Sequence, residues 1–196
     1  MIFFPVSLNL VGRRCVVIGT DREAIEKEAA LREVGADVVW IKSEEAIDES
    51  ELAQAFFVIS TPQNAEFSAR LRTLADRQRF LLCCIDQPKY GFVAMAAIVK
   101  AGPVRVAIST AGLAPRVGKI LKNALQTVMD GTFVRFINCL AMQRQRARRQ
   151  YPDSSAQRRK AMIEAADGFE VVVSLQYPAW FLPSMEAQLP HFTDKS

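Results

Sequence analysis

Six consecutive residues near the N-terminus have the spacing of a loop that binds a phosphate group. They read Gly19-Thr20-Asp21-Arg22-Glu23-Ala24 and follow a short apolar run. In dinucleotide-binding folds a turn of pattern Gly-x-Gly-x-x-Gly/Ala joins a strand to a helix whose N-terminus binds the pyrophosphate. The first glycine and the last alanine fit, but Asp21 replaces the middle glycine and adds a negative charge beside the phosphates.

The next strand of such a fold usually ends in an acidic residue that accepts the ribose hydroxyls. Here Lys42 stands at that point, and Glu44 and Glu45 come slightly later. Taken alone, the two segments leave open whether the domain binds a dinucleotide or has kept the fold without that function.

Histidine and cysteine counts narrow the chemistry. His191 is the only histidine, which excludes a histidine-centred triad and a multi-histidine metal site within one chain. The cysteines are Cys15, Cys83, Cys84 and Cys139, and they show no Cys-x-x-Cys spacing. Reduced, buried thiols are therefore favoured over a disulfide or a zinc site. Acid–base chemistry must come from a carboxylate, a lysine, a tyrosine or a cofactor.

The elements that position these residues alternate along the first half of the chain. Short apolar runs predict strands at 15–18, 38–41, 56–59 and 80–85, and amphipathic stretches predict helices at 24–34 and 67–79. Continuous apolar strands between helices are typical of a parallel sheet covered on both faces. The predicted fold is a doubly wound α/β, Rossmann-like domain.

The pattern changes after residue 86. Two strands, 95–99 and 104–108, are joined by a turn at 100–103, and helices are predicted at 116–129, 133–149 and from Ser154 or Ser155 to 166. We therefore expect a Rossmann-like domain at 1–112, a helical part at 113–167 and an aromatic tail of unknown role at 168–196.

Charge is unevenly placed along the chain. The net charge is +4, yet the stretch 143–160 alone holds seven arginines and lysines against one aspartate. A basic helical face suggests an anionic partner, although a solvated surface explains it equally well. Nucleic acid is the weakest candidate, because the stretch has no interleaved aromatic residues and matches no recognition module.

Half of the residues are hydrophobic, which excludes wholesale disorder. No apolar run approaches the roughly 18 residues of a membrane helix, and the N-terminus has no positively charged leader. We expect a soluble cytoplasmic protein without a membrane partner.

Three segments together resemble the N-terminal module of siroheme synthase, the precorrin-2 dehydrogenase/sirohydrochlorin ferrochelatase family. Residues 4–14 resemble its Phe-Pro-x-x-Leu-x-Leu-x-Gly-Arg start, and residues 84–88 its Val-Val-Asp-x-Pro motif. Residues 102–115 resemble its Gly-Pro-Leu-x-Ile-Ala-Ile-Ser-Thr-x-Gly-x-Ser-Pro run almost position by position. The arginine-rich stretch 121–166 resembles the part that forms the dimer and binds the tetrapyrrole.

The resemblance implies oxidation of precorrin-2 to sirohydrochlorin with NAD as hydride acceptor, followed in many members by insertion of ferrous iron. It implies a homodimer, and it implies that Asp86 is the catalytic acid–base residue of both steps. The cofactor would contact Gly19, Thr20, Asp21, Arg22 and Thr61. The tetrapyrrole carboxylates would contact Ser109, Thr110, Gly112, Arg116 and Lys119, with Arg105, Lys122 and the arginines of 144–149 as further candidates. No metal ligands are expected.

The departures from the family pattern lie mostly on the cofactor side. The family's Gly-Gly-Gly after the first strand is Gly19-Thr20-Asp21 here, and its Ala-Thr-Asp-Asp after the third strand is Ser60-Thr61-Pro62-Gln63. The alternative function is therefore a tetrapyrrole-binding or carrier protein, or a chelatase only, that no longer uses NAD.

Overall fold

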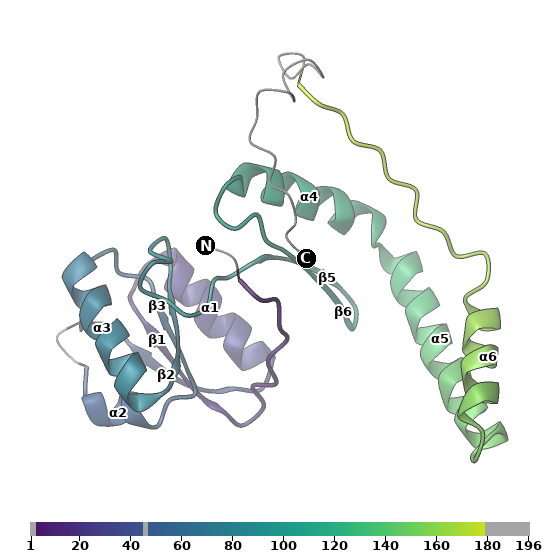
Figure 1. Ribbon diagram of the computed structural model, residues 1–196, viewed down its shortest axis with the longest axis horizontal. Coiled ribbons are helices and arrows are strands. Elements are labelled where there is room, and N and C mark those ends of the chain that lie inside the picture. The colour runs from purple at the N-terminus through teal and green to yellow at the C-terminus, as the bar shows by residue number, and fades with distance from the viewer. Residues whose placement is uncertain (1–2, 45–46, 179–196) are drawn as a thin grey trace. The chain divides into compact units, whose positions relative to one another are not determined.

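The computed structural model of the chain describes residues 3–44 and 47–178 (Figure 1). The chain divides into two compact units, one ending at Val134 and the other beginning at Arg135. The domain boundaries expected at 112 and 167 stay predictions. His191, Glu45 and the part of the tail after residue 178 lie outside the described residues.

The first unit is built on a four-stranded parallel sheet. Its strands are β1 (Arg14–Ile18), β2 (Asp37–Ile41), β3 (Phe57–Ser60) and β4 (Leu81–Cys84), in the order β2-β1-β3-β4. Ile18 pairs with Ile41 on one side and with Ser60 on the other. The strands thus end level with one another, so the loops that follow them gather at one edge of the sheet.

Three helices connect these strands, namely α1 (Arg22–Glu33), α2 (Glu49–Ala53) and α3 (Ala65–Gln78). Each begins after a residue whose side-chain oxygen accepts backbone N–H bonds of the first turn: Asp21, Asp48 and Asn64. The cap at Asp21 starts α1 two residues before the predicted residue 24. The short helix α2 was not predicted.

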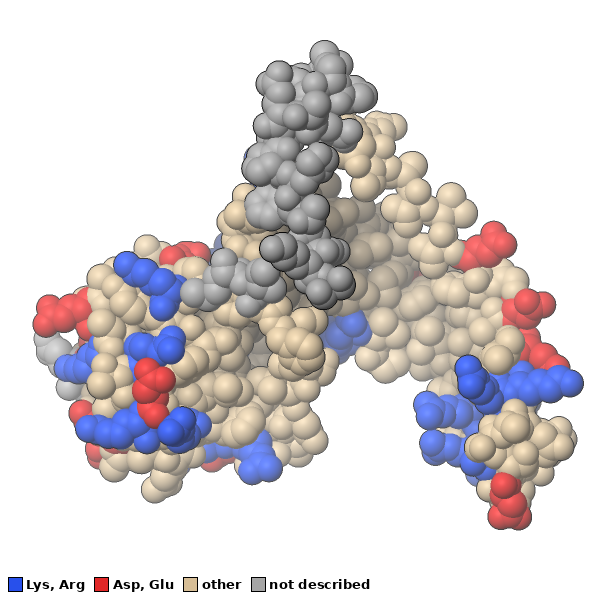
Figure 2. All heavy atoms as spheres, in the orientation of Figure 1, with Lys and Arg blue, Asp and Glu red and all other residues tan. Residues whose placement is uncertain are grey.

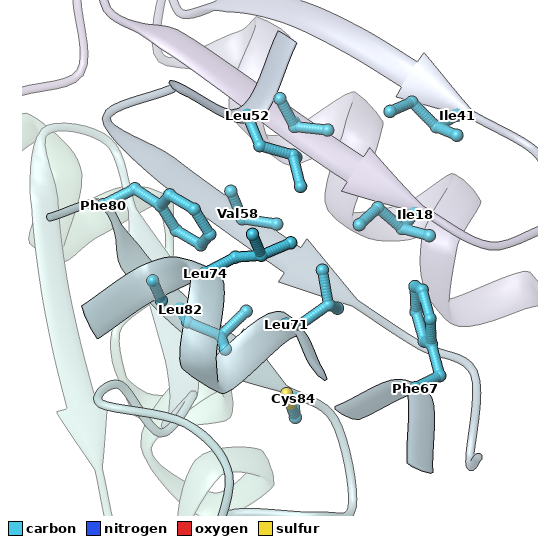
Figure 3. Packing of buried hydrophobic residues seen from close by; sticks show 12 residues of the cluster. Ile18, Ile41, Leu52, Val58, Phe67, Leu71, Leu74, Phe80, Leu82 and Cys84 are labelled. Atoms are coloured by element: carbon cyan, nitrogen blue, oxygen red, sulfur yellow. The ribbon is translucent and has the colours of Figure 1, made fainter. Parts of the chain in front are cut away.

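Both faces of the sheet are covered, and α1 and α3 lie on opposite sides of it in Figure 1. On one face, buried residues of the strands pack against Leu52 of α2 and Leu71 of α3 (Figure 3). On the other face, Val17, Ile59 and Cys83 pack with Ala24 and Leu31 of α1. Burial on both faces explains why the strands are apolar at nearly every position, the exceptions being Arg14, Asp37 and Ser60 at strand ends, and the predicted doubly wound fold is confirmed.

A strand pair and a helix complete the first unit. β5 (Ala97–Ala101) and β6 (Val104–Ile108) are antiparallel, and α4 (Pro115–Val128) packs on β5. The side chain of Gln126 fixes this packing, because it accepts from the Lys100 N–H at 3.1 Å and donates to the Lys100 carbonyl at 2.8 Å. β5 starts two residues later than the predicted strand at 95–99.

The second unit is helical. It contains most of α5 (Gly131–Gln150) and all of α6 (Ser155–Ala165), close to the predicted bounds. Ser154 caps α6, and Phe136 stacks on Phe169 with ring centroids 4.9 Å apart. No helix among the described residues is both long and apolar enough to cross a lipid bilayer.

All four cysteines are free, as expected, and Cys15, Cys83 and Cys84 are buried in the sheet. Burial raises the pKa of the Cys83 thiol to about 12 and that of Cys15 to about 11. Cys139 is exposed on α5, so the expectation that every thiol is buried is wrong for this residue. The segment of α5 that carries Cys139 is not covered within its own unit.

Candidate functional site

The glycine loop lies where β1 ends and requires a residue without a side chain. Gly19 has a φ of +127°, and a Cβ there would approach the Thr61 hydroxyl oxygen to 2.1 Å. Thr61 is buried in the loop after β3, and its hydroxyl donates to the Ile18 carbonyl at 3.4 Å. Gly19 therefore lets the loops after β1 and β3 lie in contact, as a dinucleotide turn requires.

Asp21 occupies the N-terminus of α1 with its own carboxylate. Its Oδ1 accepts the backbone N–H of Ala24 at 2.7 Å. This N–H is among the donors that a pyrophosphate would use at a helix N-terminus, so Asp21 competes with the ligand. Arg22 does not compensate for that charge at the loop, because its exposed guanidinium pairs with Glu26 at 2.8 Å.

A cavity of about 300 Å³ lies at this loop and is lined by Gly19, Thr20, Asp21, Lys42, Glu44, Thr61 and Pro62. Its volume is at the lower end of the range for small-molecule sites. The turn at Gly19 and the exposed N-terminus of α1 fit a dinucleotide once the Asp21 carboxylate leaves Ala24. Four of the five residues predicted to contact the cofactor meet here, and Arg22 is the exception.

A second cavity, of about 590 Å³, joins the end of β4 to the end of β6. Asp86, Ser109, Thr110 and Gly112 all line it, together with Glu23 and Lys27 of α1. The Asp-x-Pro and Ser-Thr-x-Gly segments, which lie more than twenty residues apart in the sequence, thus face one space. This is the arrangement that a shared ligand would need.

Asp86 adopts an uncommon backbone conformation, with a φ of +59°. Aspartate tolerates this left-handed region better than most residues, and such strain often marks a functional position. Its Oδ2 accepts a hydrogen bond from the Gln63 side-chain amide at 3.1 Å. The carboxylate is therefore oriented from the loop that also carries Thr61.

Two contributors to the site were not among the predicted residues. Gln63 was noted only as a departure from a motif, and the signal that points to it is its place just after Thr61-Pro62, at the end of β3. Lys27 lies in the second cavity and pairs with Glu23, with Nζ and Oε1 2.6 Å apart. The helical i,i+4 spacing of this pair was visible in the sequence.

The Ser-Thr-x-Gly segment forms a tight turn that leaves its polar groups on the cavity. The Ser109 hydroxyl accepts the Ala111 N–H at 3.3 Å, and the Leu113 N–H donates to the Thr110 carbonyl at 2.9 Å. Ala111 and Gly112 both have positive φ, which fits glycine at 112.

The predicted basic contacts are not brought to this cavity. Arg116 and Lys119 lie on α4 and are exposed, but neither lines the cavity, whose α4 residues are Pro115 and Gly118. Lys122, also on α4, is likewise not among the lining residues. Arg105 pairs with Glu33 at 3.7 Å and bonds the carbonyls of Gly102 and Val104. Their predicted role in substrate binding stays a prediction.

The arginines of the second unit gather around a separate cleft of about 820 Å³ between α5 and α6. Four of them line it: Arg144, Arg148, Arg158 and Arg159. Figure 2 shows the basic side chains crowded at the end of this helix pair. Arg158 is held by the carbonyls of Tyr151 and Pro152 at 2.7 and 2.6 Å. The surface suits an anion, and it contains no described carboxylate.

The geometry defines a Rossmann-like nucleotide-binding module with an appended helical unit. Residues 6–97 match a family model described as putative NAD(P)-binding. A siroheme synthase of Xylella fastidiosa is 28% identical over 205 residues, covering 95% of this chain and 43% of the relative. A siroheme synthase of Nitrosococcus oceani is 26% identical over 176 residues, covering 81% of this chain and 38% of the relative.

Shorter relatives match over nearly their whole length. A precorrin-2 dehydrogenase of Bacillus subtilis is 25% identical over 160 residues, which cover 72% of this chain and 98% of the relative. The solved structure of "SirC, precorrin-2 dehydrogenase" is 20% identical and shares the fold, with a TM-score of 0.64 over 85% of this chain and 90% of that one.

The chain is thus similar to siroheme synthases and to precorrin-2 dehydrogenase, in line with the resemblance of its motifs. It spans about two fifths of the length of the siroheme synthases it matches.

Proposed function

We propose that the protein is a precorrin-2 dehydrogenase of siroheme biosynthesis, which oxidises precorrin-2 to sirohydrochlorin with a nicotinamide dinucleotide as acceptor. The observation that carries this proposal is that Asp86 and the Ser109–Gly112 turn face one cavity beside the glycine loop. The relatives named for this activity, and the match of residues 6–97 to an NAD(P)-binding family, support it.

The oxidation removes a hydride and a proton from the macrocycle. The nicotinamide ring supplies the hydride acceptor when the dinucleotide is bound. Gly19, Thr20 and Thr61 would hold the dinucleotide, and the backbone N–H groups of α1 would face its pyrophosphate after Asp21 releases Ala24. The Asp86 carboxylate would take the proton, oriented by the Gln63 amide.

The tetrapyrrole carries several carboxylates, which need cations and hydrogen-bond donors. Ser109, Thr110 and Gly112 line the cavity and would supply hydroxyl and backbone donors. Lys27 also lines this cavity, where it pairs with Glu23, and would supply a positive charge.

The first test is an anaerobic incubation of the purified protein with precorrin-2 and NAD, in which sirohydrochlorin and NADH are followed together. Their appearance in equal amounts is the expected result. The Asp86→Asn variant should lose about 100-fold or more in rate, because a positioned acid–base group contributes about that much. Asp76→Asn is the matched control, since Asp76 is an exposed aspartate of α3 that pairs with Arg72. Equal loss in both variants would contradict the role of Asp86.

A second function is favoured by the Asp21 cap. Because this carboxylate already bonds the α1 N-terminus, the dinucleotide could be excluded, which would leave a tetrapyrrole carrier or a chelatase. In metal insertion Asp86 would take the pyrrole N–H protons as ferrous iron enters. A spectral shift of the bound tetrapyrrole without turnover at millimolar NAD would favour this function, and iron insertion into sirohydrochlorin would then be assayed.

We further propose a homodimer that acts in the cytoplasm. The free cysteines fit a reducing compartment. Exposed apolar residues on α4, among them Val117 and Ile120, fit a surface that a second copy covers.

A further inference from the structure

In dinucleotide-binding folds the side chain of the residue that follows β2 contacts the adenosine ribose. A carboxylate there accepts the ribose hydroxyls of NAD, and a cation there accommodates the 2′-phosphate of NADP. In this chain the residue is Lys42. The Gly19 N–H donates to the Ile41 carbonyl at 3.0 Å, so Lys42 begins beside the glycine loop.

The side chain of Lys42 is tied to that loop through Trp40. The Lys42 Nζ lies 5.0 Å from the centroid of the Trp40 ring, and the Trp40 indole N–H donates to the Gly19 carbonyl at 2.8 Å. Lys42 also lines the 300 Å³ cavity. A cation–π contact therefore holds the ammonium group at the edge of the cofactor cavity.

The two carboxylates of the same cavity are engaged elsewhere. Glu44 accepts from the Asn64 side-chain amide at 3.1 Å, while Asn64 itself caps α3. Asp21 caps α1. None of the ion pairs among the described residues involves Lys42. The group at the ribose position is thus a cation whose charge no described carboxylate neutralises in an ion pair.

We propose that this cavity selects a dinucleotide with a 2′-phosphate on the adenosine ribose over the unphosphorylated form, and that Lys42 contacts that phosphate. The inference rests on the proposed function, because it takes the cavity to be the dinucleotide site. An ammonium group is a compact point charge that suits a phosphate dianion, whereas the ribose hydroxyls of NAD have no carboxylate acceptor at this position.

The test is calorimetric titration of the 196-residue chain with NADP⁺ and with NAD⁺ at one fixed, low salt concentration. NADP⁺ should bind about tenfold or more tightly than NAD⁺, which corresponds to one charge-assisted hydrogen bond. The same order is expected for 2′,5′-ADP against 5′-ADP, which isolates the adenosine half from the nicotinamide.

Variants at Lys42 assign the preference to this residue. Lys42→Ala should weaken NADP⁺ about tenfold and leave NAD⁺ nearly unchanged, and Lys42→Glu should reverse the order of the two. Lys89→Ala is the matched control, because Lys89 also lies over an aromatic ring, 4.8 Å from the Tyr90 centroid, but outside the cavity. Circular dichroism of each variant checks that the fold is kept.

The possible results separate this inference from the function on which it rests. Equal or tighter binding of NAD⁺ overturns the inference, while the proposed dehydrogenase stands. A preference for NADP⁺ that survives in Lys42→Ala overturns the role of Lys42. Failure of both dinucleotides to bind overturns the inference together with the dehydrogenase and leaves the carrier or chelatase function.

Discussion

Asp21 stabilises the protein and opposes its proposed cofactor through the same hydrogen bond. The carboxylate caps α1 at 2.7 Å and places a negative charge where a pyrophosphate would lie. A glycine at position 21 would leave the N–H groups free and add no charge. The chain therefore combines a stable helix start with an unfavourable charge in the cofactor cavity.

We predict that Asp21→Gly tightens dinucleotide binding about tenfold, since one charge-assisted contact of the pyrophosphate is freed. The cost in unfolding free energy should be only a few tenths of a kcal/mol, because glycine is itself a tolerated N-cap. Calorimetric titration and urea unfolding measure the two effects. Asp48→Gly removes the cap of α2 outside the cavity and should leave binding unchanged. Weaker binding in Asp21→Gly would mean that Asp21 helps to hold the cofactor.

Gln63 is a positioning residue for Asp86. Gln63→Ala removes the 3.1 Å hydrogen bond, so kcat for precorrin-2 oxidation should fall about tenfold or more while the dinucleotide Kd stays the same. Gln63→Glu should be worse, because it places a second carboxylate beside the first. Gln78→Ala, an amide at the far end of α3, is the control. An unchanged kcat in Gln63→Ala would show that Asp86 needs no such support.

Among the elements, α3 contributes most visibly to one face of the sheet. Leu71 is fully buried between the strands and the rest of the helix (Figure 3). Leu71→Ala should lower the unfolding free energy by about 2–5 kcal/mol through lost contacts and the cavity left behind. Thr73→Ala on the exposed side of the same helix should change it by less than about 0.5 kcal/mol. Urea unfolding, followed at two wavelengths, measures the change in unfolding free energy for both variants. Similar changes in Leu71→Ala and Thr73→Ala would contradict the described packing.

The thiols differ by the element that carries them. Cys139 on α5 is exposed, whereas Cys83 in β4 is buried with a pKa of about 12. The Cys139 thiol alone should therefore react quickly with a disulfide reagent at pH 8 in the folded protein. The Cys139→Ser variant should lose this fast phase of the reaction. Four fast thiols in the wild type would contradict the burial of the sheet cysteines.

The raised pKa of Cys83 also gives stability a pH dependence. Its thiol is protonated in the folded state well above its ordinary pKa of 9.0, whereas the unfolded chain loses the proton near that value. The contribution to the unfolding free energy is complete below about pH 9 and is lost as the pH rises toward 12. Unfolding in urea across this range should show a decline that Cys83→Ala reduces.

The sequence predicted the strands and the longer helices of the sheet domain well, because apolar runs and amphipathic periodicity were both strong there. Largely apolar strands and amphipathic helices identify a covered parallel sheet without any knowledge of contacts. α2 was missed because five residues are too few for periodicity, and the start of α1 moved because the cap at Asp21 outweighs the apolar pattern. The place of Asp86 in a ligand cavity came from a motif resemblance.

The sequence patterns could not predict the hydrogen bonds that complete the site. The bond from Gln63 to Asp86 joins residues 23 apart, and the tie from Trp40 to Gly19 joins residues 21 apart. The first depends on β3 lying beside β4, and the second on β2 lying beside β1. Arg116 and Lys119 are the opposite case. They lie close in sequence to the Ser-Thr-x-Gly turn, yet they do not line the cavity.

At the scale of the whole molecule, the exposed apolar side of α4 predicts self-association. Val117, Ile120 and Val128 are 50%, 58% and 67% exposed, although the helix is strongly amphipathic. Sedimentation should show a particle of twice the chain mass of 21.9 kDa. Ile120→Glu should shift it to a monomer, and Ile25→Glu on α1, where Ile25 is 51% exposed, should not. A wild-type monomer at micromolar concentration would contradict the proposed dimer.

The strand order also decides when during synthesis the sheet can be completed. β1 pairs with β2 and with β3, in the register Cys15 to Phe57, and β4 must still be added beside β3. All these pairings are parallel and join distant segments, which makes them slow to form. The β5–β6 hairpin closes locally and needs only microseconds. The loops that carry Gly19 and Asp86 therefore come together only after β4 has left the ribosome. The lining of the cofactor cavity ends at Pro62, whereas the lining of the second cavity extends to Gly118. The second cavity is therefore completed later in synthesis than the cofactor cavity.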